Sequence, residues 1–189
     1  MTSTAQASEL GTGTWVIDPM HSAIAFVVRH LTVAKVRGNF TSFGGELRIS
    51  DELESCSVSA TVDVESLTTR QSDRDAHLRS PDFFDAATYP HISYRSTDVR
   101  RESDGVYLVS GELTIRDVTR PIELRVEANG VTPDPMGTSR AGFSATGAFN
   151  RRDFGIVFDM PMGGPGFVIG DQIKVELDVA AVLQAGEGG

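Results

Sequence analysis

The length, composition and charge of this chain exclude several classes of protein. Its 189 residues suit one domain that builds a full hydrophobic core without disulfides or metals to stabilise it. Its single cysteine, Cys56, excludes an internal disulfide. The formal net charge of −9 repels phosphate backbones and anionic lipid surfaces, so we expect a neutral or apolar partner and no nucleic acid.

The two ends of the sequence read as flexible tails around one domain at 14–183. Residues 1–13 and 184–189 are mostly small or polar. The first of these segments has no basic residue and no apolar run of signal-peptide length, and no later segment approaches the roughly 18 continuous apolar residues of a membrane span. We therefore expect a cytoplasmic protein that does not span a membrane.

Strict alternation of apolar and polar residues dominates the chain and predicts β-strands. Turn residues at Asp104-Gly105, Asn129-Gly130 and 133–137 predict connections between antiparallel neighbours. In chain order the predicted strands are 22–30, 33–40, 45–50, 57–64, 91–99, 106–115, 122–128, 141–149 and 173–179. Two of these runs are candidates for one bent strand.

Only one segment, 72–79, predicts an α-helix. Ser72 is the expected N-cap, and Asp73 and Asp75 place negative charge in the first turn. A proline after Ser80 predicts one more helical turn through Phe83 and Phe84.

These elements predict an all-β fold: a single antiparallel β-barrel of about eight strands with one short helical excursion. A closed barrel buries one apolar face of every strand and removes both sheet edges. A two-sheet sandwich is the alternative. An eight-strand barrel is either filled by side chains or holds one small ligand, and this choice decides the function.

An ordered series of short motifs resembles the YceI-like family. The motifs are Trp15-Val16-Ile17-Asp18-Pro19-Met20-His21-Ser22, Gly38-Asn39-Phe40, the run from Asp75 to Asp85, Tyr89-Pro90, Gly111-Glu112-Leu113, Val118-Thr119-Arg120-Pro121 and the run from Asn150 to Ile156. The resemblance covers about 14–183. It implies a lipocalin-like barrel whose elongated apolar pore holds a polyisoprenoid or a similar long-chain amphiphile, with no known catalytic residue.

Aromatic side chains are the main candidates for lining such a pore, because ten phenylalanines carry much of the apolar bulk. The predicted ligand-binding residues are Phe26, Val28, Phe40, Phe83, Phe84, Tyr94, Phe143, Phe149, Phe154, Phe158 and Phe167. The glycine-rich stretch 162–166 is a candidate for a mobile flap over one mouth of the barrel, with a plain connection as the alternative.

Three arginines are candidates for holding a lipid head group: Arg74, Arg79 and Arg152. A guanidinium suits a pyrophosphate or a carboxylate. The alternative, which we prefer, is a solvated face paired to the abundant acidic residues.

No residue pattern indicates catalysis, a metal or a cofactor. The four histidines, His21, His30, His77 and His91, form none of the spaced pairs of a metal site, and no nucleophile has an adjacent base or a nucleophile elbow.

Three functions follow. The first is a carrier that stores or transports a polyisoprenoid, an isoprenoid quinone or a related lipid without catalysis. The second is an enzyme acting on a lipid or a quinone. The third is a filled barrel that binds a partner, with a homodimer through the outer face of Ala23, Ala25 and Val27 as one form.

Overall fold

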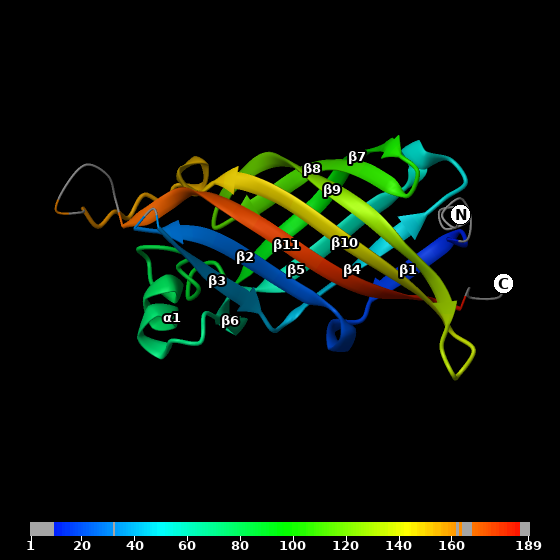
Figure 1. The fold of residues 1–189 in the computed structure, drawn as a ribbon, viewed down its shortest axis with the longest axis horizontal. Helices are drawn as coiled ribbons and strands as arrows, with labels where there is room; N and C mark the ends of the chain where they lie inside the picture. The colour runs from blue at the N-terminus through cyan, green and yellow to red at the C-terminus, as the bar shows by residue number, and fades with distance from the viewer. Residues whose placement is uncertain (1–9, 32, 162, 164–167, 186–189) are drawn as a thin grey trace.

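The computed structural model describes residues 10–31, 33–161, 163 and 168–185 (Figure 1). Its strands are β1 Gly13–Ile17, β2 Ala23–His30, β3 Ala34–Phe40, β4 Phe43–Ile49, β5 Ser57–Asp63, β6 Leu67–Thr68, β7 His91–Ser103, β8 Val106–Ile115, β9 Val118–Pro133, β10 Ser139–Asn150 and β11 Ile169–Leu183. The helix α1 spans Ser72–Arg79, as predicted. Most of each predicted flexible tail, 1–9 and 186–189, lies outside the described residues, and so does most of the predicted flap, at 162 and 164–166.

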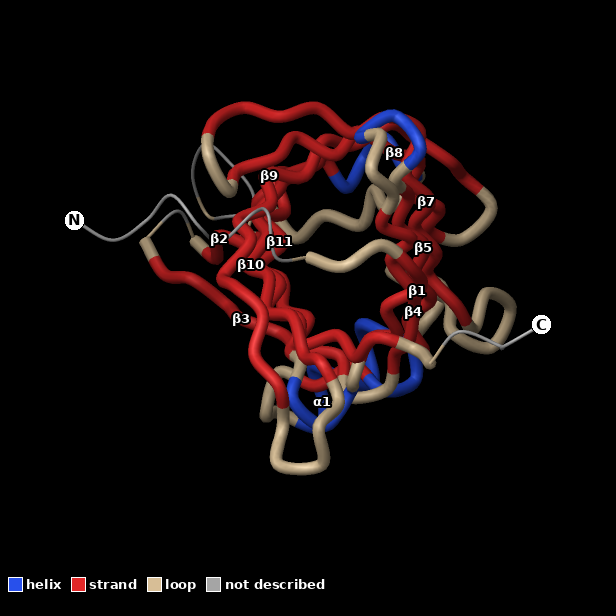
Figure 2. The backbone as a smooth tube through the Cα atoms, turned by 90° about the vertical axis from the view of Figure 1, so that its right-hand side faces the viewer, coloured by secondary structure: helices blue, strands red, loops and turns tan. Residues whose placement is uncertain are grey.

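The sheet closes on itself because β11 pairs with β10 along one side and with β1 along the other. The closed ring runs β1-β4-β5-β7-β8-β9-β10-β11, with every neighbouring pair antiparallel. The view along the barrel shows this ring from one end (Figure 2). The predicted antiparallel barrel of about eight strands is confirmed.

At three places the chain bends and one strand continues directly into the next, so that two successive strands occupy one position in the barrel wall. β1 continues into β2, and the two pair with successive parts of β11; β3 likewise continues into β4, and β5 into β6. An aspartate starts two of these bends, since the carboxylate of Asp18 accepts from the Met20 amide and that of Asp63 from the Glu65 amide. Each carboxylate caps a short 3-10 turn that interrupts the strand.

The predicted turn at Asn129-Gly130 is wrong, because β9 runs straight through it. The pairing of β9 with β10 shifts by one residue here: Gly130 lies opposite Gly142, while Ala128 lies opposite Phe143. Gly130 has a φ of 111°, which favours glycine. The dipeptide therefore forms a β-bulge within β9. A bulge, like a turn, can use the positive φ that glycine allows.

Two predictions around α1 are also wrong in detail. The helix is capped by Gln71, whose side chain accepts from the Arg74 amide, and not by Ser72. Residues 81–84 form hydrogen-bonded turns in place of a helical turn, with the Phe84 amide donating to the Leu78 carbonyl at 3.0 Å. Among the described residues no helix is long and apolar enough to cross a membrane.

Candidate ligand cavity

An apolar cavity of about 510 Å³ runs inside the barrel. This volume lies in the range of roughly 300 to 1,000 Å³ that ligand pockets occupy. Residues near both ends of the barrel line it: Leu10 and Ile49 beside the start of β1, and Val28 and Ile169 beside the end of β2. The interior is therefore hollow along most of its length.

Most of the predicted ligand-binding side chains meet at this cavity. Those that line it are Phe26, Val28, Phe40, Phe83, Phe84, Tyr94, Phe143 and Phe149. Phe154 is not among the lining residues; it is buried behind Phe149, with the ring centroids 5.1 Å apart. Phe158 packs on His77 and Phe83, with centroids 4.9 and 5.2 Å apart. Phe167 lies outside the described residues.

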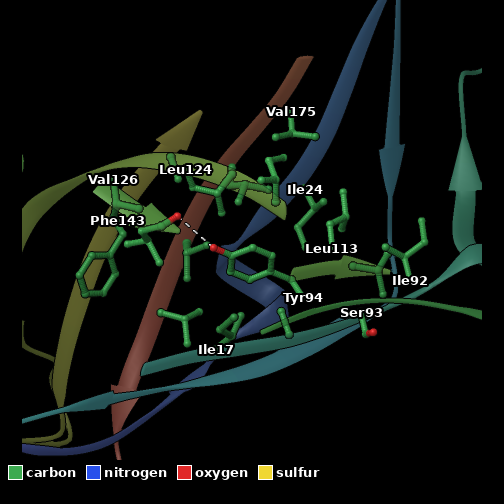
Figure 3. Close-up of a pocket in the computed structure, with 18 of the residues that line it drawn as sticks. Ile17, Ile24, Ile92, Ser93, Tyr94, Leu113, Leu124, Val126, Phe143 and Val175 are labelled. Carbon is green, nitrogen blue, oxygen red and sulfur yellow. Dashed lines mark hydrogen bonds between the residues drawn. The ribbon is translucent and has the colours of Figure 1, made fainter. Parts of the chain in front are cut away.

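Aliphatic side chains form the larger part of the cavity wall. Apart from Val28, they are not among the predicted ligand-binding residues, because that prediction was based on aromatic side chains. They include Ile17, Ile24, Ile92, Leu113, Leu124, Val126 and Val175, which Figure 3 shows around one stretch of the lumen. Their signal in the sequence is the inward phase of the alternation. Leu124 and Val126 face the cavity, while Glu123 and Arg125, which alternate with them, form ion pairs on the outer surface.

Two glycines shape the lumen by letting an aromatic ring lie directly over a neighbouring strand. A Cβ atom on Gly38 would come within 2.2 Å of the Phe26 ring, and one on Gly111 within 2.5 Å of the Tyr94 ring. The absence of a side chain at each position lets the ring pack against the backbone, as glycine in a strand often does. Both rings then line the cavity.

Tyr94 brings a hydroxyl into this apolar interior. The hydroxyl donates to the Val109 carbonyl at 3.1 Å (Figure 3). Burial, and to a lesser extent the negative charge of Glu123, raises the pKa of Tyr94 from 10.0 to about 12. The phenol is therefore a neutral, hydrogen-bonded part of the wall at physiological pH.

The raised pKa of Tyr94 predicts a late ionisation step. The folded chain holds this proton to a higher pH than the unfolded chain, so the contribution to stability is complete below pH 10 and is lost as the pH rises toward about 12. In a titration followed by tyrosinate absorbance, one of the three tyrosines should ionise last, and Tyr94→Phe should remove that step. An unchanged titration curve in Tyr94→Phe would contradict the assignment.

The three arginines predicted to bind a head group are not among the residues that line the cavity. Arg74 donates to the side chain and the carbonyl of Thr69, and Arg79 donates to the carbonyls of Glu65 and Leu67. Arg152 pairs with Asp159 and Asp171. Arg74 and Arg79 thus link α1 to the segment before it, and Arg152 links the end of β10 to Asp159 and to the start of β11.

Arg151, which is not among the three predicted arginines, is the arginine that lines the cavity. Its side chain is only 3% exposed. It donates to the carbonyls of Gly170, Ile156 and Phe158 and pairs with Asp159 and Asp171. Arg152 and then Arg151 hold the pKa of Asp159 below its usual value. The Arg151 guanidinium ties the segment after β10 to the start of β11.

The remaining polar lining groups gather mainly at the opposite end, beside the start of β1. They are Thr12, Ser50, Asp51, Cys56 and Ser57. The Cys56 thiol lies 3.6 Å from the Ser50 carbonyl oxygen. This end of the cavity can hydrogen-bond a polar group, whereas the middle offers almost entirely hydrocarbon.

The histidines lie apart from one another. His21 contacts Asp18 and His77 contacts Asp82, each at 2.8 Å. Within the part of the chain that the structure describes, no three histidine, cysteine, aspartate or glutamate side chains come together where they could hold a metal ion.

Known proteins are similar to this chain in sequence or in fold. The YceI-like domain matches residues 15–181. A UPF0312 protein of Vibrio cholerae is 38% identical over 145 residues, which are 75% of this chain and 77% of that protein.

Two solved structures resemble the fold. BcnA of Burkholderia cenocepacia has a TM-score of 0.75 at 18% identity, covering 87% of this chain and 98% of that one. A domain from Saccharophagus degradans, described as polyisoprenoid binding and implicated in plant cell wall breakdown, has a TM-score of 0.69 at 15% identity, covering 92% of this chain and all of that one. The match over 15–181 and the similarity to the Vibrio relative show that this chain belongs to the YceI-like family.

Proposed function

We propose that the protein binds a long apolar lipid inside the barrel, and stores or transports it without catalysis. The observation that carries the proposal is the cavity of about 510 Å³ with its hydrocarbon wall. The polyisoprenoid binding described for the Saccharophagus degradans domain supports a polyisoprenoid, an isoprenoid quinone or a related amphiphile as the cargo.

The energetics favour a long chain. Burying one methylene is worth about 0.8 kcal/mol, so three five-carbon prenyl units contribute roughly 10 kcal/mol before the association cost of about 4 to 15 kcal/mol. Short chains barely offset that cost. We therefore expect affinity to rise with chain length until the cavity is filled.

The charges at the cavity favour a neutral head group. Arg151 already donates to three carbonyls and two carboxylates, so binding an anion would require breaking these contacts. Asp51 at the other end adds a negative charge beside Ser50 and Ser57. A hydroxyl, phenol or quinone head fits this lining better than a pyrophosphate, which the sequence alone had suggested for Arg74, Arg79 and Arg152.

The filled barrel that binds a partner has less support, because a cavity of about 510 Å³ lies inside the barrel. The ion pair between Arg37 on β3 and Glu176 on β11 spans β2 beside Ala25 and Val27. It therefore places charge on the outer apolar face that the sequence suggested for a homodimer.

Purification without added lipid, followed by native mass spectrometry, tests the proposal. We expect a stoichiometric long-chain isoprenoid or a related amphiphile that is released on denaturation and is chemically unchanged after incubation with the protein. An empty barrel that also takes up no added polyprenyl alcohol would refute lipid binding, and a lipid converted during incubation would indicate an enzyme.

A further inference from the structure

Exposed apolar side chains gather at one end of the barrel. The described residues contain six large apolar side chains that are exposed, and four of them lie on two segments beside the end of β2. These four form what we call the apolar rim: Leu31, Val33, Val157 and Met160. The other two, Met20 and Met136, lie on the turn between β1 and β2 and on the turn between β9 and β10.

The two segments of the apolar rim are joined through the chain that enters β11. The Leu31 amide donates to the Val168 carbonyl at 2.8 Å, and the Val168 amide donates to the Met160 carbonyl at 2.9 Å. In Figure 1 the turn after β2 and the start of β11 lie side by side at the left end of the barrel. The two segments that carry the apolar rim are thus hydrogen-bonded to each other through Val168.

The cavity reaches this end. Ile156 and Ile169 line it, and they are the chain neighbours of Val157 on the apolar rim and of Val168, which joins the rim segments. Val28, three residues before Leu31, also lines it. A lipid leaving the cavity at this end would meet the apolar rim first.

Two turns at opposite ends of the barrel carry charges of opposite sign. Exposed Arg29 and Lys35 flank the turn that carries Leu31 and Val33, so this hairpin tip is both apolar and basic in a chain whose net charge is −9. The 3-10 turn at the other end is acidic, with exposed Asp51, Glu52 and Glu54 around it. An anionic surface would attract the first end and repel the second.

We propose that the apolar rim docks the barrel on an anionic lipid bilayer, so that the cavity opens toward the membrane from which it is loaded. This inference rests on the proposed function. Basic residues beside exposed apolar side chains are the combination that binds anionic bilayers, because the cations are attracted to the lipid charge while the apolar groups enter the interface. The acidic far end keeps the barrel in one orientation.

Sedimentation with vesicles tests the docking. The probes are vesicles of phosphatidylcholine alone and of phosphatidylcholine mixed with phosphatidylglycerol. We expect binding to the mixed vesicles that weakens as salt screens the charges. The double variant Val33→Ser/Val157→Ser should bind about tenfold more weakly, and Lys35→Glu about fivefold more weakly.

Met20→Ser/Met136→Ser is the matched control, since it removes two apolar side chains that are more exposed than Val33 and Val157 and lie away from the apolar rim. It should bind as the wild type does. Equal binding by both double variants, or no binding to the mixed vesicles by a protein that carries lipid in native mass spectra, would overturn the docking and leave lipid binding intact. Vesicle binding that depends on the apolar rim in a protein that never takes up lipid would refute the proposed function and leave the docking intact.

Discussion

Tryptophan in place of Ala145 should reduce the lipid carried per barrel to less than about a tenth of the wild-type amount. Ala145 lies on β10, is 8% exposed and lines the cavity. An indole at this position would project into the lumen between Val126 and Leu177, the partners of Ala145 on the neighbouring strands. Because it would occupy the space that the lipid chain needs, the variant should lose most of the buried apolar contact that drives binding.

The fold should survive this change, since overpacking a wall beside an open cavity costs about 1 to 3 kcal/mol. Native mass spectrometry and uptake of a polyprenyl alcohol measure the loss. The matched control is Thr146→Trp, which adds the same ring at an exposed position one residue along β10 and should leave the bound lipid unchanged. A fully loaded Ala145→Trp protein would show that the cargo does not pass this part of the lumen.

The alternation of residues predicted the barrel because it reports directly which side chains face inward. Along β9, Ile122, Leu124 and Val126 line the cavity as their phase requires. The same pattern predicted one bent strand but did not predict where the strands bend. Val64 is buried like Val62, but it lies in the 3-10 turn that follows β5. Asp63 caps this turn and occupies a polar position of the alternation, so the pattern of apolar residues does not reveal the turn.

The choice between Arg151 and Arg152 could not be made from the sequence. The two are adjacent in a 3-10 turn that ends β10, and the geometry of that turn decides which side chain enters the barrel. The sequence reasoning named Arg152, on the argument that a guanidinium at a strand end binds a head group. The residue that lines the cavity is its neighbour Arg151. The guanidinium of Arg151 donates to backbone carbonyls and carboxylates from segments later in the chain.

Replacing Arg151 by methionine should lower the free energy of unfolding by about 3 to 5 kcal/mol, because each buried carbonyl that loses its only side-chain donor costs about 1 to 3 kcal/mol. Methionine retains most of the apolar stem but leaves the carbonyls of Gly170, Ile156 and Phe158 without their guanidinium donor. Arg152 still pairs with Asp159 and Asp171, so the loss should fall mainly on these carbonyls. Arg151→Lys should recover only part of the stability, because an ammonium lacks the fork of five donors.

Urea unfolding of the lipid-free protein measures this loss without a contribution from bound ligand. The control is Arg48→Met, which breaks an ion pair with Glu46 where the arginine is 67% exposed; such pairs contribute about 0 to 1 kcal/mol. If Arg151→Met cost no more than Arg48→Met, the Arg151 contacts would not hold the segment after β10 to the barrel. A loss of several kcal/mol would show that this arginine serves the structure of the cavity end and is not held ready for a head group.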